Sequence, residues 1–152
     1  MDKESYFMEV ALQEAKKAFN KNEVPVGAVI VCDGKIVAKA HNLKEELNTA
    51  TAHAEILAIN TASSKLNNWR LEDCVLYVTL EPCAMCASAI VQSRIKEVVI
   101  GALDNKEGAV ITSKHIFENN HNHKLFVKTG VLKDDCEKII NLFMSLNRGA
   151  ID

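Results

Sequence analysis

The sequence has no hydrophobic run long enough to cross a membrane, because none approaches the roughly 18 apolar residues that a transmembrane helix needs. It also has no basic leader followed by an apolar stretch, since the first five residues are Met-Asp-Lys-Glu-Ser. The five cysteines are an odd number, which does not suit a disulfide framework. We therefore expect a reduced, cytoplasmic protein without a membrane partner.

A strong charge of either sign is absent as well, because 18 Lys and Arg face 20 Asp and Glu, a formal net charge of −2. RNA-binding proteins usually show a basic patch, and this total supplies none by itself, although local clustering could. Charge therefore neither supports nor excludes an RNA substrate. Repeats, linkers and low-complexity tracts are missing too, so the 152 residues, 48% of them hydrophobic, suit one domain spanning 1–152.

The first half of the chain shows a helical pattern, a hairpin pattern and a second helical pattern. Apolar residues recur at helical spacing over about 3–22. The apolar runs 24–31 and 35–40 flank Asp33-Gly34, a pair that favours the type I′ turn of a β-hairpin. Thr51 is a candidate cap for a helix over about 52–66.

The second half predicts a right-handed crossover. Strand 75–80, helix 83–93 with Pro82 at its first position, and strand 97–102 follow one another, so the two strands should be parallel neighbours. The remaining predicted elements are a weaker helix (113–118), a strand (124–128) and a closing helix (133–147) with the apolar stripe Cys136, Ile139, Ile140, Phe143 and Leu146. The fold class is therefore α/β, a three-layer α/β/α domain with a five-stranded mixed sheet.

One motif pair carries the chemistry. His53 and Glu55 are followed by Pro82-Cys83-Ala84-Met85-Cys86, which adds two thiols to one imidazole. Structural zinc sites usually have four Cys or His ligands, whereas three protein ligands leave one position open for water. Both parts of the motif fall at predicted helix starts, and the Cys part lies at the carboxyl end of a strand, where open α/β sheets bind ligands. This pattern predicts a catalytic zinc ion held by His53, Cys83 and Cys86.

The same residues predict a reaction type. A helix N-terminus lowers the pKa of a thiol, so both cysteines are expected to be thiolates. The metal can lower the pKa of its bound water towards ~7. Glu55 is then free to act as a general base that passes the water's proton to a ring nitrogen and to a leaving amine. Hydrolytic deamination of a nucleobase needs these transfers.

Plainer interpretations exist for each part. A lone Cys-x-x-Cys also occurs in structural zinc and redox sites, and a lone His-x-Glu says little. Cys32, Cys74 and Cys136 lie on or near apolar segments and are expected to be core residues. His121 and His123 suit a solvated loop better than a metal site, and no role is assigned to His41 or His115.

Several fragments resemble the tRNA adenosine deaminase family, within the cytidine-deaminase-like superfamily, and the likeness extends over most of the chain. They are Glu23–Ala28, His41-Asn42, Thr51–Glu55, Trp69–Leu71, Leu76–Cys86 and Ser93–Ile95. The resemblance implies conversion of the wobble adenosine of a tRNA anticodon to inosine, one zinc per subunit, parallel last strands and a homodimer that holds the anticodon stem-loop, with no DNA partner. It also implies that Asn42 hydrogen-bonds the flipped base. From chemistry alone, Asn42 is equally a loop-capping side chain.

Some positions depart from the family pattern. Ser88 and Ile111 stand where Gly is usual, Ala50 where Pro is frequent, and the closing helix carries fewer basic residues. A basic surface would have to come from Lys114, Lys124, Lys128, Lys133, Lys138 and Arg148, each of which can equally be a solvated side chain. Two alternative functions therefore remain: a deaminase of a free base or nucleoside (guanine, cytosine or cytidine), and a catalytically idle binding subunit. The intact Glu55 argues against the second.

Overall fold

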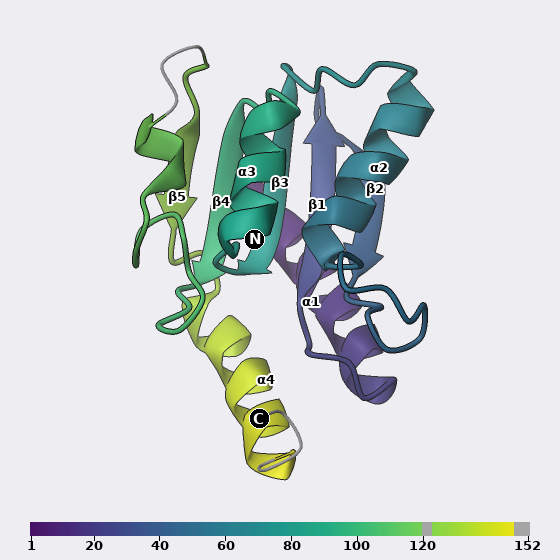
Figure 1. Ribbon diagram of the computed structural model, residues 1–152, viewed down its shortest axis with the longest axis vertical. Coiled ribbons are helices and arrows are strands. Elements are labelled where there is room, and N and C mark those ends of the chain that lie inside the picture. Colours follow the sequence, from purple (N-terminus) through teal and green to yellow (C-terminus); the bar gives the residue numbers. More distant parts are fainter. Residues whose placement is uncertain (120–122, 148–152) are drawn as a thin grey trace.

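A five-stranded mixed sheet forms the centre of the protein in the computed structural model, which describes residues 1–119 and 123–147 (Figure 1). The strands are β1 (Gly27–Cys32), β2 (Lys35–His41), β3 (Cys74–Leu80), β4 (Glu97–Ala102) and β5 (Phe126–Thr129), in the order β2-β1-β3-β4-β5. β1 is antiparallel to β2 and β3, whereas β3, β4 and β5 are parallel neighbours. The predicted mixed sheet, crossover and parallel last strands are confirmed.

The hairpin between β1 and β2 has the predicted turn. Asp33 and Gly34 both have positive φ, at 52° and 76°, as a type I′ turn requires. Cys32 pairs with Lys35 across the turn. The register shifts between Ile30 and Val31, and β2 then ends at His41, which pairs with Gly27 and is followed by Asn42.

Within the described residues, four α-helices cover the two faces of the sheet. They are α1 (Lys3–Asn20), α2 (Ala54–Leu66), α3 (Ala84–Gln92) and α4 (Lys133–Leu146), and a short 3-10 helix, η1 (Ile116–Asn119), precedes β5. In Figure 1, α2 and α3 lie in front of the sheet and α1 lies behind it. Alternate residues of each strand point to opposite faces of the sheet. Ile30, Leu76 and Val98 pack in the hydrophobic cluster beneath α2 and α3. Val29, Tyr77 and Val99 pack in the cluster formed with α1 and with Cys136 of α4. The three-layer α/β/α prediction is confirmed.

The helix α1 lies unusually close to β1. A Cβ atom on Gly27 would be 1.8 Å from the carbonyl oxygen of Ala11, so only glycine permits this approach. The Gly27 amide also donates a hydrogen bond to Thr79 Oγ1 (3.1 Å), which ties β1 to β3 near the end that carries the Cys motif. The close packing and this hydrogen bond together hold the start of β1 beside the end of β3, which the Cys motif follows.

Some predicted boundaries were wrong. α2 begins at Ala54 rather than 52, with His53 in the N-cap position instead of Thr51. Pro82 precedes the N-cap Cys83 and so is not the first residue of α3. The predicted helix 113–118 is the 3-10 turn η1, and the strand predicted at 124 begins at Phe126. In α4, Cys136 and Phe143 are buried, but Leu146 is 67% exposed and does not belong to the core stripe.

No helix within the described ranges is long and apolar enough to span a membrane. His121 and Arg148 lie outside the described residues.

Candidate active site

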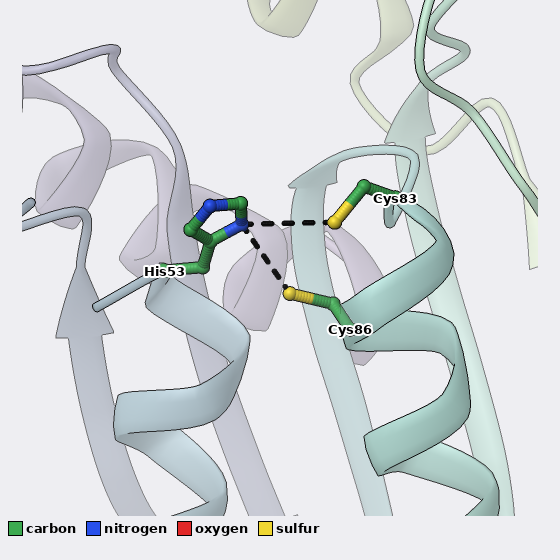
Figure 2. A group of neighbouring side chains, drawn as sticks. All are labelled: His53, Cys83 and Cys86. Carbon is green, nitrogen blue, oxygen red and sulfur yellow. Dashed lines mark hydrogen bonds between the residues drawn. The ribbon is translucent and has the colours of Figure 1, made fainter. Parts of the chain in front are cut away.

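Two helix starts supply the candidate metal ligands. His53 is the N-cap of α2 and Cys83 is the N-cap of α3, and both have extended backbone conformations (φ −78°, ψ 151° and φ −73°, ψ 177°). N-cap side chains normally accept a hydrogen bond from the first turn of their own helix, but neither of these does so. Figure 2 shows instead that both side chains point toward each other beyond the helix ends, with Cys86 from the first turn of α3 beside them.

The spacing of the three ligand atoms matches a tetrahedral zinc site. His53 Nδ1 lies 3.7 Å from Cys83 Sγ and 3.5 Å from Cys86 Sγ (Figure 2), and all three atoms lie within 4.8 Å of one another. With zinc–sulfur bonds of about 2.3 Å and zinc–nitrogen bonds of about 2.0 Å, tetrahedral geometry separates nitrogen from sulfur by roughly 3.5 Å. The residues present therefore fit a zinc ion, as the sequence motif predicted.

Glu55 is not part of that ligand group. It lies in the first turn of α2, is only 4% exposed, and its burial raises the pKa of its carboxyl to about 7. The carboxyl also lies within hydrogen-bonding reach of the Cys86 thiol. A carboxyl with a pKa near 7 can both accept and return a proton at neutral pH, which is what general acid–base catalysis needs.

Among the protein groups alone, the two thiols differ in pKa. A hydrogen bond from Cys86, together with one from His53, lowers the pKa of Cys83 to about 3. The neighbouring Cys83 raises the pKa of Cys86, and hydrogen bonding to Cys83 also raises the pKa of His53. A coordinated cation would hold both thiols as thiolates, as expected from the sequence, because a metal-bound thiol is deprotonated.

Asn42 caps the helix that carries His53. Its Oδ1 accepts a hydrogen bond from the Ala54 amide at 2.7 Å, and the residue is 6% exposed. The capping role predicted for Thr51 thus belongs to Asn42, which lies just after the end of β2 and not next to the helix in the sequence. The prediction that the Asn42 side chain acts as a cap is confirmed. The Asn42 amide nitrogen has no partner within the described part of the chain. Asn42 also lines a pocket of about 430 Å³ together with Lys21, Lys44 and Phe143, and none of the candidate zinc ligands lines that pocket.

The other candidate residues lie away from the ligand group. Cys74 and Cys136 are buried and Cys32 is partly buried, as expected for core residues. His41 Nδ1 lies 2.9 Å from Glu14 Oε1, His115 pairs with Glu118, and His123 contacts the Ile95 carbonyl oxygen. Of the lysines proposed for a basic surface, Lys128 is paired with Glu4 at 2.7 Å, and Lys124 lies over the Phe126 ring.

Sequence reasoning missed two buried carboxylates beside the site. Glu23 accepts hydrogen bonds from the amides of Glu45 and Glu46, in the loop that follows Asn42. Glu81, two residues before Cys83, accepts bonds from a loop that follows β4. In the sequence, Glu81 stands at the end of an apolar strand and Glu23 just before one, and neither position by itself indicates a role.

Comparison with known proteins places this geometry in a family. Residues 1–102 match the cytidine and deoxycytidylate deaminase zinc-binding region. The tRNA-specific adenosine deaminase of Aquifex aeolicus is 50% identical over 147 residues, covering 96% of this chain and 97% of the relative. That of Bacillus subtilis is 47% identical, covering 94% of this chain and 89% of the relative.

A solved structure also matches this chain. It comes from work on A-to-I editing by tRNA:A34 deaminases, has a TM-score of 0.85 and 44% identity, and the match covers 88% of this chain and 98% of that one. The chain therefore belongs to the cytidine and deoxycytidylate deaminase family and, within it, to the tRNA-specific adenosine deaminases.

Proposed function

We propose that residues 1–152 form one deaminase domain that converts adenosine to inosine at the wobble position of a tRNA anticodon. The observation that carries this proposal is the ligand group His53, Cys83 and Cys86 at tetrahedral zinc spacing, with the buried Glu55 beside it. Similarity over nearly the whole chain to tRNA-specific adenosine deaminases supports the substrate.

The reaction is adenosine plus water giving inosine plus ammonia. Zinc held by these three residues supplies, when bound, a water whose pKa is lowered to about 7 and which can attack C6 near neutral pH. Glu55 accepts the proton of that water and delivers it to ring nitrogen N1, and then assists protonation of the departing amine. The burial that raises the pKa of Glu55 to about 7 suits both transfers.

We assign base recognition to Asn42. Its oxygen is engaged by the Ala54 amide, which leaves its amide N–H groups to donate to an acceptor on the base. Capping also fixes the orientation of the side chain before the base arrives. Asn42 thus has a structural and a binding role in one side chain.

The proposed partner is the anticodon stem-loop of a tRNA, acted on in the cytoplasm by a homodimer. The target base must leave its stack to reach a buried site, and single-stranded loops permit this at the smallest cost. The five free cysteines support a reducing compartment.

One specific observation favours a second candidate. A solved guanine deaminase from Bacillus subtilis is 41% identical to this chain, with a TM-score of 0.62 over 64% of this chain. Deamination of a free base therefore has to be tested beside tRNA editing.

A substrate panel distinguishes these functions. The zinc-loaded protein is incubated with an anticodon stem-loop bearing wobble adenosine, the same stem-loop with wobble guanosine, free adenosine, guanine, cytosine and cytidine, and inosine or ammonia is measured. We expect turnover of the adenosine stem-loop in large excess over every free compound. Guanine or cytosine turnover without editing of the stem-loop would instead establish the second function.

A further inference from the structure

The carboxylate of Glu81 is the centre of a hydrogen-bond cluster that the deamination chemistry does not use. Glu81 is 2% exposed. Its Oε2 accepts from the amides of Val110, Ile111 and Thr112 at 3.1, 2.8 and 2.9 Å. Its Oε1 accepts from the Asp104 amide at 3.0 Å and from Thr112 Oγ1 at 2.5 Å. Five bonds from a single loop thus converge on one side chain.

That loop lies against the Cys motif. It leaves the carboxyl end of β4 after Ala102, and the Ala109 amide donates to the Pro82 carbonyl oxygen at 3.0 Å, one residue before Cys83. Figure 1 shows it at the same edge of the sheet as the start of α3. A Cβ on Gly108 would be 2.3 Å from Glu81 Oε1, so glycine is needed where the chain wraps the carboxylate.

The cluster requires Glu81 to be ionised. Burial alone would raise the pKa of Glu81, but the hydrogen bonds from Thr112, Asp104 and Ile111 outweigh it and hold the pKa below its ordinary value. Hydrogen bonds to a charged acceptor are stronger than neutral ones, so the loop is held rigidly. Two large apolar side chains on it remain exposed, Leu103 at 41% and Ile111 at 43%.

We propose that Glu81 is a positioning residue for RNA: it fixes the Leu103–Thr112 loop as a rigid rim beside the Cys motif, against which the nucleotides next to the reacting adenosine pack. The inference rests on the proposed function. An enzyme for a free base closes over its substrate, which requires a loop that moves. A polynucleotide has to enter and leave the site as a chain, so a braced, open rim suits it.

The test compares three variants that disturb the cluster with one that does not. Glu81→Gln replaces one acceptor oxygen with an amide that faces N–H donors. Gly108→Ala adds a methyl group that would clash with the Glu81 carboxylate. Thr112→Val removes only the hydroxyl donor, so we expect it to be the mildest of the three. Glu107→Gln removes a charge from an exposed side chain of the same loop and is the matched control.

We expect Glu81→Gln to raise the KM for the stem-loop at least about tenfold, with kcat and zinc content close to those of the wild type. Hydrogen exchange at the amides of residues 110–112 should accelerate in parallel, and Thr112→Val should show smaller changes of the same kind. Loss of a negative charge alone would favour RNA binding, so Glu107→Gln should leave KM unchanged or lower.

Three outcomes would overturn the inference. Unchanged KM and exchange in Glu81→Gln and Thr112→Val would show that the cluster does not position the rim. A fall in kcat or zinc content at constant KM would show that it supports the ligand group instead. If the wild type does not edit the stem-loop, the proposed function itself fails, whereas wild-type editing with unaffected variants overturns only the role of Glu81.

Discussion

At the scale of single residues, two N-cap positions hold metal ligands instead of capping side chains. His53 and Cys83 make no cap hydrogen bonds; Asn42 supplies the cap of α2, whereas α3 forgoes about 1 kcal/mol. Zinc binding to comparable Cys and His groups is worth roughly 10–16 kcal/mol in zinc-finger peptides, so the metal outweighs the missing cap of α3. Both positions have the extended backbone that lets a side chain reach past the helix end.

Loss of one thiol should abolish zinc binding. We expect Cys86→Ala to retain little zinc, because one thiolate and one imidazole are a weak ligand set. The measurement is zinc per chain by elemental analysis after dialysis. Cys136→Ala is the matched control, since Cys136 is equally buried but lies on the other face of the sheet. Full zinc content in Cys86→Ala would mean that the ligand set is wrong.

The motif residues could be predicted from the sequence because their spacing carries the chemistry directly. Asn42 and Glu81 were harder, because their partners are 12 and 23 to 31 residues away in the chain. A side-chain hydrogen bond across such a separation depends on the tertiary fold, and no local pattern encodes it. Resemblance to a family suggested a role for Asn42. Glu81 lies in the fragment Leu76–Cys86, which resembles the family, but the resemblance suggested no role for it.

At the scale of elements, α2 depends on a cap supplied from the end of β2. Asn42→Ala should lower the free energy of unfolding by about 1 kcal/mol, because the Ala54 amide loses its acceptor, and should also impair editing. Asn42→Asp keeps an acceptor oxygen at the helix N-terminus but loses the amide donor. It should therefore keep most of the stability and lose base recognition.

Urea denaturation and stem-loop kinetics on both Asn42 variants check this prediction. An Asn42→Asp protein that edits like the wild type would show that the amide donor does not contact the base. An Asn42→Ala protein of unchanged stability would remove the capping role.

Element types were predictable where periodicity or turn chemistry was strong, as in the hairpin at Asp33-Gly34. The later boundaries depended on neighbours. β5 begins at Phe126 because its partner strand begins at Glu97, so Lys124 and Leu125 have no strand beside them. The segment predicted as a helix at 113–118 is shortened to η1. The amide of Ile116, the first residue of η1, donates to the Ala109 carbonyl oxygen in the Leu103–Thr112 loop.

At the scale of the whole molecule, the parallel strands bring the carboxyl ends of β3 and β4 to one edge of the sheet. The Cys motif follows β3 and the Leu103–Thr112 loop follows β4, so the parallel pairing of the two strands places the motif and the loop side by side. The order of elements predicted this edge from the sequence. The antiparallel pairing of β1 with β3, which brings Asn42 and His53 to the same place, could not be derived from local patterns.

The stability of the molecule should fall in acid partly through Glu81. Its pKa in the folded protein is below the ordinary 4.5, and the same holds for Glu14, where hydrogen bonds from Lys17 and His41 outweigh burial. A depressed folded-state pKa adds stability above the unfolded-state value, and this is lost as pH falls through the folded-state pKa. The stability difference between wild type and Glu81→Gln should thus be constant above about pH 5 and narrow below about pH 4.5.

Denaturation at about pH 7, 4.5 and 3 measures that difference. Protonation of the zinc ligands affects both proteins alike and cancels in the comparison. A difference that stays constant down to about pH 3 would contradict an ionised Glu81 at the centre of the cluster.

The most direct test of the central claim compares wild type with Glu55→Gln, measuring zinc content and inosine formed in the stem-loop on the same samples. The account predicts equal zinc in both proteins and a rate lowered by at least about 10²-fold in Glu55→Gln, because the ligand group stays intact while the proton carrier is lost. Comparable inosine formation by the two zinc-loaded proteins would contradict it.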